Sequence, residues 1–370
     1  MRNPHRLTSA TVIASIAIVS IVLLAACATG SEQVESHSTA STASTVAFPL
    51  PDTGQTTSYT ATAGEDADTA INPPSYTDNG DGTVTDNVTG LMWQQYDGGE
   101  MTHADAVAYC AGLSLGGHSD WRLPTAHELF SINYLGAISP ALDTSVFTQD
   151  YTTLYGADYV RELYWWSGDQ RSDTDSRAWV TNAGGGIGAH QKAETHSYAS
   201  GPGSDGKTRY FHVRAVRNVT TPDLPSSHFT DNGDGTVTDN FTGLVWQQAV
   251  SSSTYTWEDA LGFVNTLNTT GGFAGKTDWR LPNIRELFSL VDVAKMSPCI
   301  DGSTFDVTSL DPYAEPANPS VPGALWSSTS MYVGPPGVEE AWDLHDLYSG
   351  IISYSLKTAT EHILCVRGGQ

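Results

Sequence analysis

The sequence contains few cysteines and few positively charged residues relative to its acidic ones. Four cysteines occur in 370 residues, which is too few for a fold that depends on a dense disulfide framework. Lysine and arginine number 17 against 41 acidic residues, so the formal net charge at pH 7 is −24. Such an acidic chain is not expected to bind nucleic acid, heparin-like polyanions or anionic lipid headgroups. Its ten tryptophans argue against a simple disordered acidic polymer.

Residues 1–26 are predicted to be a signal peptide. Arg2 and Arg6 precede an apolar run that ends in Leu24-Ala25-Ala26-Cys27, and this ending resembles the lipobox of bacterial lipoproteins. The resemblance implies cleavage before Cys27, acylation of its thiol and anchoring in a membrane. Because Ala28 rather than aspartate follows, it also implies sorting to the outer membrane or cell surface. A transmembrane helix with an incidental Cys27 is the alternative, but the run is shorter than the roughly 18 to 20 residues of a span.

Residues 27–72 are predicted to be the acylated cysteine followed by a flexible tether. The segment is rich in serine, threonine and alanine and has almost no large apolar side chains. Such a segment buries too little apolar surface to offset the entropy of ordering it. Removal of the signal would take away two arginines and no acids, which moves the net charge from −24 to −26.

The rest of the chain is a duplicated domain. Residues 76–95 and 229–248 are identical at 17 of 20 positions, and DWRLPTAHELFSI at 120–132 returns as DWRLPNIRELFSL at 278–290. Two copies of this length are globular domains and not solenoid repeats. We place the first domain at 73–220, a linker at 221–228 and the second domain at 229–370. Each carries a complete set of motifs and is predicted to fold alone.

The motifs predict the same local structure in both copies. The DNGDG turns favour a β-hairpin with strands at 83–85 and 91–93 in the first copy. A helix is expected from about His103 to Leu113, with Thr102 as its N-cap. Thr125 and Glu128 fit a capping box for a second helix. The predicted class is α+β, with two helices, a small and mostly antiparallel sheet, and long loops in each copy.

The combination of DNGDGTVTDNxTGLxWQ, DWRLPxxxELxS, a later WS and a terminal VR resembles the C-terminal domain family of the bacterial collagen-like adhesin Lcl. The WRLP element also resembles formylglycine-generating enzymes and their sulfatase-modifying relatives. These resemblances imply two tandem C-type-lectin-like domains. The adhesin family implies surface attachment through carbohydrate binding, with sulfated polyanions as its ligands. The acidic charge of this chain disfavours that ligand class here.

Carboxylates of the hairpin motif are candidate calcium ligands, because closely spaced oxygen ligands suit calcium. Turn chemistry is the competing interpretation and the favoured one, since the spacing lacks the EF-hand pattern. No other cofactor is predicted. The candidate calcium ligands are Asp78, Asp81 and Asp86 in the first copy and Asp231, Asp234 and Asp239 in the second.

The copies differ most at about 136–212 and 292–364, and divergent loops on a repeated scaffold are where binding sites are usually built. An aromatic face there would suit a sugar ring or a protein partner. The candidate ligand-binding residues are Trp165, Trp166, Trp326 and Trp342.

The lectin-like resemblance implies a disulfide between the first helix and the last strand of a domain. Cys110 occupies the helix position of the first copy and Cys365 the strand position of the second, so each copy keeps half of that bridge. Cys299 follows the second helix of its own copy and could reach its last strand. The predicted pair is therefore Cys299–Cys365, with Cys110 as a buried free thiol.

We expect a non-enzymatic surface lipoprotein that binds an extracellular glycan or protein. The first alternative is an enzyme, or enzyme accessory, related to the formylglycine-generating group; that chemistry uses cysteines, and no closely spaced pair occurs here. The second alternative is a structural envelope protein. The sequence predicts no oligomeric state.

Overall fold

The computed structural model describes most of the chain after residue 47. The described residues are 48–137, 140–149, 163–171, 176–192, 209–220, 224–296, 298–310, 323–331 and 339–369. The predicted signal peptide, Cys27 and the tether up to residue 47 lie outside these ranges. Residues 45–370 belong to one compact unit that contains both copies.

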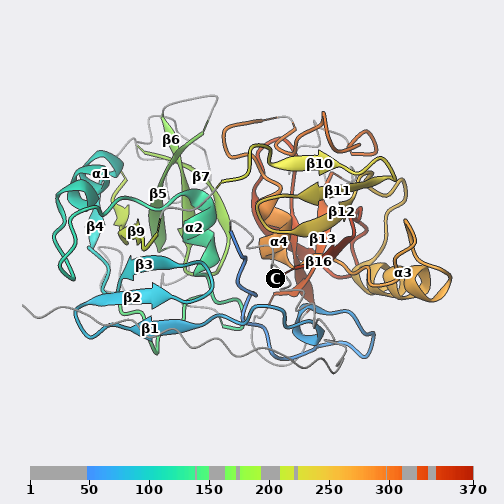
Figure 1. The fold of residues 1–370 in the computed structure, drawn as a ribbon, viewed down its shortest axis with the longest axis horizontal. Helices are drawn as coiled ribbons and strands as arrows, with labels where there is room; N and C mark the ends of the chain where they lie inside the picture. Colours follow the sequence, from blue (N-terminus) through green and yellow to red (C-terminus); the bar gives the residue numbers. More distant parts are fainter. Residues whose placement is uncertain are drawn as a thin grey trace, which may run out of the picture. The chain divides into compact units, whose positions relative to one another are not determined.

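Each copy runs from a β-hairpin through two helices to strands that return to the hairpin (Figure 1). The first copy contains β1 (Tyr76–Asp78), β2 (Thr83–Asp86), β3 (Leu91–Gln94), β4 (Glu100–Met101), α1 (His103–Gly112), α2 (Ala126–Ser131), β5 (Tyr164–Gln170), β6 (Arg177–Asn182), β7 (Ile187–Gln191), β8 (Phe211–His212) and β9 (Val216–Asn218). The second contains β10 (Phe229–Asp231), β11 (Thr236–Asp239), β12 (Leu244–Gln247), α3 (Trp257–Thr269), α4 (Ile284–Ser289), β13 (Leu325–Ser330), β14 (Glu340–Leu344), β15 (Ile352–Leu356) and β16 (Val366–Gly368).

The predicted hairpins and helix caps are confirmed. The turn between β1 and β2 needs left-handed backbone, which Gly80 and Gly82 adopt with φ of 74° and 84° at no steric cost. The Thr102 side chain caps α1 by accepting a hydrogen bond from the Asp105 N–H. Thr125 and Glu128 form the predicted capping box of α2, and Asn283 and Glu286 repeat it at α4.

The strands form three sheets, and the third one spans both copies. Two four-stranded sheets have the orders β1-β2-β3-β9 and β10-β11-β12-β16, so the last strand of each copy pairs with its first hairpin. The third sheet has the order β13-β14-β15-β7-β6-β5-β8-β4. It is antiparallel except where β5 meets β8. The two copies join in it through Ile187 of β7 and Ile352 of β15.

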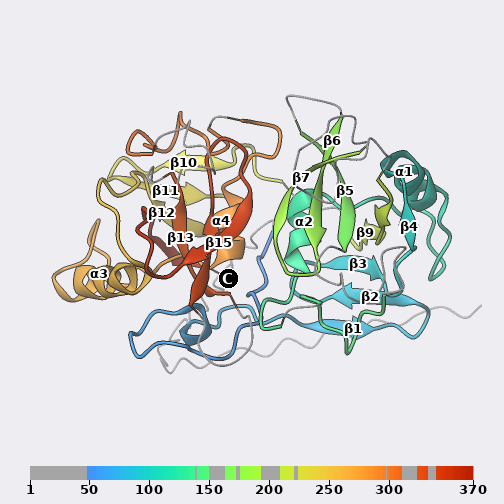
Figure 2. The same ribbon diagram turned by 180° about the vertical axis from the view of Figure 1, so that it is seen from behind.

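A hydrophobic core common to both copies lies beside this junction. The side chains of Phe130 on α2 and Phe288 on α4 pack edge to face, with ring centroids 5.0 Å apart. The Trp179 indole N–H of the first copy donates to the carbonyl of Val293 in the second, at 3.2 Å. Helices α2 and α4 are neighbours in both views (Figures 1 and 2). Independent folding of the copies stays a prediction, and either one alone would expose apolar surface that the pair buries.

Residues 48–72, which we call the N-terminal segment, are folded against the rest of the unit. The prediction of a flexible tether is wrong for this stretch. The Asp66 carboxylate, in a short helical turn (η1, Asp66–Asp68), accepts hydrogen bonds from Thr53 at 2.6 Å and Thr329 at 2.7 Å. The Ser330 hydroxyl donates to Glu65 at 2.5 Å. The segment orders through buried polar bonds, which an argument from apolar content alone does not count.

Arg285 ties the N-terminal segment to both copies. Its side chain, on α4, is only 3% exposed. One terminal nitrogen donates to the carbonyl oxygens of Pro51 and Asp52 at 2.8 and 2.6 Å. The other donates to the carbonyl of Asn133 in the first copy. Three separate parts of the chain therefore share one buried guanidinium.

Asp66 makes the stability of this arrangement depend on pH. Burial raises its pKa to about 6, against the hydrogen bonds from Thr53 and Thr329, which lower it. Because the folded-state pKa is raised, the stabilising contribution is fully present below the unfolded-state pKa of about 3.9 and is lost as pH rises through about 6. Asp66→Asn, which removes the charge, is expected to stabilise the protein by up to about 3 kcal/mol at pH 7.5.

That gain should shrink steadily between pH 6.5 and pH 4, as measured by urea unfolding of the two proteins at each pH. Glu361, whose pKa burial and the neighbouring Asp343 raise to about 9, adds a pH dependence of its own. Both proteins share that contribution, so the difference between them isolates Asp66. A difference that is constant with pH would contradict the assignment.

Candidate functional site

The six hairpin aspartates act as turn residues. Asp78 accepts the Gly80 N–H at 2.8 Å, and Asp81 accepts the Thr83 N–H and hydroxyl at 3.1 and 2.6 Å. Asp86 accepts the Val88 N–H at 2.9 Å. The second copy repeats these bonds with Asp231, Asp234 and Asp239. Within the described ranges no group of three or more potential ligands is arranged to hold a metal ion. Calcium binding stays a prediction, and turn chemistry accounts for these carboxylates.

The repeated DWRLP and VR motifs join the middle of each copy to its last strand. Arg122 donates to both carboxylate oxygens of Glu128, at 2.7 and 2.6 Å, so it anchors the capping box of α2. Asp120 pairs with Arg217 on β9 at 2.7 Å. Arg280 with Glu286 and Asp278 with Arg367 repeat both pairs in the second copy. The strongest sequence signals therefore mark the scaffold.

Three of the four candidate ligand-binding tryptophans are core residues, and their assignment to an exposed binding face is wrong. Trp166 and Trp326 are fully buried, and Trp342 is 2% exposed. Trp166 donates its indole N–H to the carbonyl of Met101 and Trp326 to that of Tyr255, both at 2.9 Å. Their rings fill equivalent places in the two copies, because both follow the same strand pairing. Trp165 lines the pocket that is described below.

The predicted Cys299–Cys365 disulfide is also wrong. Both residues are free thiols, as is Cys110, and all three are buried. Cys299 lies in the core shared by the copies, whereas Cys365 lies in a separate cluster behind α3. Burial raises the pKa of Cys110 and of Cys365 to about 12, and it also raises that of Cys299. Thiols held protonated in this way are poor nucleophiles.

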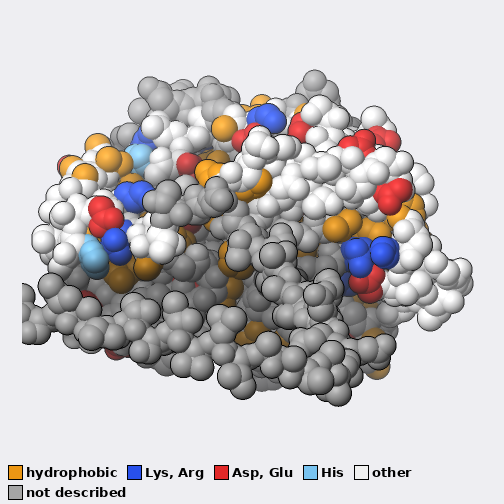
Figure 3. Space-filling view, viewed as in Figure 1, with side chains coloured by type: hydrophobic (Ala, Val, Ile, Leu, Met, Phe, Trp, Pro, Cys, Tyr) orange, Lys and Arg blue, Asp and Glu red, His pale blue; other side chains and the backbone are white. Residues whose placement is uncertain are grey.

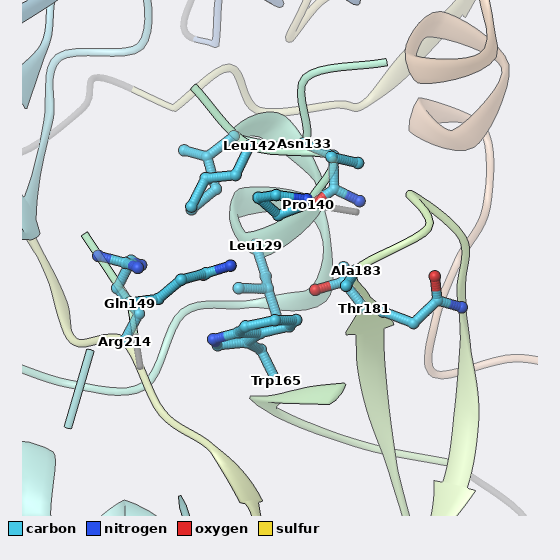
Figure 4. Close-up of a pocket in the computed structure, with 12 residues that line it drawn as sticks. Leu129, Asn133, Pro140, Leu142, Gln149, Trp165, Thr181, Ala183 and Arg214 are labelled. Carbon is cyan, nitrogen blue, oxygen red and sulfur yellow. The ribbon is translucent and has the colours of Figure 1, made fainter. Parts of the chain in front are cut away.

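A small pocket in the first copy is the best candidate binding site. Its free volume is about 20 Å³, which has room for a few atoms and is far smaller than a typical small-molecule site. Apolar walls and polar groups alternate around it, with Trp165 opposite Leu142 and Asn133 (Figure 4). The polar lining residues are Asn133, Gln149, Thr181, Asn182 and Arg214.

Arg214 is held rigidly at one side of this pocket. It is 1% exposed, and it donates to the carbonyl oxygens of Gln94 at 2.8 Å and of Thr148 at 3.2 Å, and to that of Gln95. Figure 4 shows its side chain on the same side of the pocket as Gln149. These backbone acceptors fix the guanidinium in place, so the polar side of the pocket is preformed.

The second copy fills the equivalent space with leucine. Trp165 pairs with Thr181 in the first copy, where Leu325 pairs with Leu344 in the second. Val216 and Val366 occupy the same position in the last strands of the two copies. Leu364 precedes Val366 by two residues, as Arg214 precedes Val216, so Leu364 takes the place of Arg214 in the second copy. The three leucines are fully buried in the shared core. The pocket is thus a property of the first copy.

Sequence reasoning missed Arg214, Thr181, Gln149 and Asn133. A signal for Arg214 was available, because VRAVR at 213–217 matches ILCVR at 363–367 with an arginine at a position that is apolar in the other copy. The pocket lies mostly within residues 136–212, where the copies differ most. Of the candidate tryptophans, Trp165 lines this pocket, and its role in binding stays a prediction.

Charge on the visible described surface does not form a single patch. On the face in Figure 3, charged side chains stand singly or in small acid–base groups between uncharged ones. Acid–base pairs at the surface include Arg217–Asp120 and Arg367–Asp278, whose aspartates are 61% and 58% exposed. Within the described part of the chain, no helix is both long and apolar enough to cross a membrane.

Comparison with known proteins identifies the repeated unit. The family model of the Lcl C-terminal domain matches residues 82–217 and again residues 235–367. These two matches coincide with the two structural copies and together cover more than half of the chain. A search of curated proteins found no match. The chain belongs to the Lcl C-terminal domain family, with two tandem copies of that domain.

Proposed function

We propose that this protein is a non-enzymatic, lipid-anchored surface protein that binds an extracellular ligand, a glycan in the first instance, through C-type-lectin-like domains. The family match over both copies carries the proposal, because it suggests an adhesin-like function at the cell surface. Two helices beside small antiparallel sheets agree with the lectin-like architecture. The anchor rests on the Leu24–Cys27 motif, and loss of lipid labelling in Cys27→Ser tests it.

The cysteine chemistry of the related formylglycine-generating enzymes finds little support in the described residues. That activity needs reactive thiols, and Cys110, Cys299 and Cys365 are buried in three different clusters. Their raised pKa values keep them protonated at neutral pH. Binding is therefore the function that we propose.

A glycan array probed with residues 45–370, the compact unit, tests this proposal. We expect selective binding to a subset of glycans and little binding to the polyanionic ones, because the chain is strongly acidic. Binding should persist at 0.5 M salt, where interactions between exposed charges are largely screened. Failure to bind any glycan on the array would count against a glycan ligand. Binding only to sulfated glycans would contradict the argument from charge.

A further inference from the structure

We propose that the pocket of the first copy binds the acetamido group of an N-acetylated sugar. This inference rests on the proposed function and makes its ligand specific. The pocket offers a hydrogen-bond donor without a partner, small apolar walls for a methyl group and a fixed cation beside them. An acetamido group presents the complementary parts, a carbonyl oxygen and a methyl group, and it carries no charge.

The donor is the indole N–H of Trp165. Trp165 is 6% exposed, and its indole nitrogen is buried without a hydrogen-bond partner among the described residues. A buried donor in that state costs free energy until an acceptor reaches it. Figure 4 shows the nitrogen on the side of the ring that is turned toward Gln149 and Arg214. A carbonyl oxygen entering the pocket from that side would satisfy it.

Among the described residues, two other tryptophans have buried indole nitrogens without a hydrogen-bond partner, but these do not indicate a binding site. Trp93 and Trp246 also have buried indole nitrogens without partners, but they occupy the same position in the two copies, opposite Val216 and Val366. They are a repeated property of the core. Trp165 has no such counterpart, because the second copy places Leu325 there, and this donor without a partner occurs where the pocket is.

The walls fit a methyl group better than a sugar ring. Leu129, Leu142 and Ala183 line the pocket and are 2%, 8% and 2% exposed. The cavity of about 20 Å³ between these walls has room for a small substituent but not for a sugar ring. Contact of a methyl group with these walls removes apolar surface from water on both sides.

The charge in the pocket suits a neutral acceptor better than an anion. Arg214 lends positive potential, which favours a carbonyl oxygen. Its two terminal nitrogens, however, already donate to the carbonyls of Gln94, Gln95 and Thr148. It therefore does not present the two-pronged edge that binds a carboxylate or a sulfate. The net charge of −24 also repels anions at long range.

Saturation-transfer NMR on residues 45–370 tests the inference. The probes are methyl N-acetyl-β-glucosaminide and methyl N-acetyl-β-galactosaminide, with methyl β-glucoside as the sugar that lacks the acetamido group. We expect the acetyl methyl protons to receive the strongest saturation and the glucoside to receive none. Binding of one N-acetyl sugar and not the other would show that the residues around the pocket distinguish the two sugar rings, and it would support the proposal. Equal binding of the glucoside, or strongest saturation at the ring protons, would overturn it.

Two variants and one control test whether the sugar binds in this pocket. Trp165→Phe keeps the aromatic ring but removes the N–H, and should weaken binding about fivefold. Trp93→Phe is the matched control in the same copy and should leave binding unchanged. Thr181→Leu introduces the residue that the second copy carries at this position, Leu344, and should abolish binding by filling the pocket. Unchanged affinity in both Trp165→Phe and Thr181→Leu, with all proteins folded by circular dichroism, would place the ligand elsewhere.

The glycan array separates the two proposals. Array glycans without N-acetyl groups that bind equally to the wild-type protein and to Trp165→Phe would leave the proposed function standing and reject this pocket. Failure of the N-acetyl sugars in NMR together with an array on which no glycan binds would reject both. Binding of an N-acetyl-lysine peptide without binding of either sugar would also overturn the assignment to a glycan.

Discussion

Arg285→Ala is expected to destabilise the protein by about 3 to 5 kcal/mol, because three buried carbonyl oxygens lose their donor at roughly 1 to 3 kcal/mol each. The variant loses the hydrogen bonds that Arg285 donates to the carbonyl oxygens of Pro51, Asp52 and Asn133. Those three acceptors would be left inside the protein without this donor, and each unpaired buried polar group carries a penalty. Urea unfolding of residues 45–370 measures the change.

Two further variants show whether the geometry of Arg285 matters. Arg285→Lys keeps the charge but has one side-chain nitrogen in place of the two that arginine uses for its three acceptors. It should therefore recover only part of the lost stability. Lys295→Ala removes an exposed pair with Asp292, whose side chains are 51% and 41% exposed, and should cost less than about 1 kcal/mol. An Arg285→Ala protein as stable as Lys295→Ala would contradict the role of Arg285.

Removing residues 45–72 is expected to lower the free energy of unfolding by about 5 kcal/mol at pH 5, where Asp66 is mostly protonated, because several buried hydrogen bonds are lost at roughly 0.5 to 3 kcal/mol each. The shortened protein loses the bonds of Asp66 with Thr329 and of Glu65 with Ser330. It also loses two of the three acceptors of Arg285. Thermal and urea unfolding of residues 45–370 and 73–370 give the comparison.

The losses of stability caused by Arg285→Ala and by removal of residues 45–72 should not be additive. In the shortened protein only the Asn133 carbonyl remains of the three acceptors, so Arg285→Ala should cost less there than in residues 45–370. A double-mutant cycle measures this coupling, which contacting groups show and distant ones do not. A flexible tether would give a different result, with equal stability of the two lengths and an unchanged cost of Arg285→Ala.

Local features of the fold were predictable from the sequence because they depend on residues close together in the chain. The hairpin turns follow from the positive φ of Gly80 and Gly82 and from aspartates that bond to N–H groups two residues away. The capping boxes join residues three apart, such as Thr125 and Glu128. Such bonds form in the same way whatever the rest of the fold does.

The predictions that failed depend on contacts between distant segments. The direction in which Trp166 and Trp326 point is decided by the pairing of β5 with β6 and of β13 with β14, and composition does not fix that register. The order of the N-terminal segment comes from partners more than 200 residues away, such as Thr329 for Asp66. The disulfide failed because the lectin-like analogy supplied a pairing, whereas Cys299 and Cys365 lie in different clusters.

The place of Arg285 also determines how the protein carries a mechanical load. A force applied to the chain before Phe48 acts on the folded unit through the N-terminal segment. Arg285 holds that segment by hydrogen bonds to the carbonyl oxygens of Pro51 and Asp52. The same guanidinium holds the carbonyl of Asn133, whose side chain lines the pocket of the first copy. Tension at the N-terminal end therefore reaches a wall of that pocket through Arg285 and through the Leu135 N–H, which donates to the carbonyl of Thr53 at 2.8 Å. If the bonds of Arg285 break under load, Asn133 keeps its own bonds to Phe130 and Gly185, and the capping boxes and hairpins, which are local, stay intact.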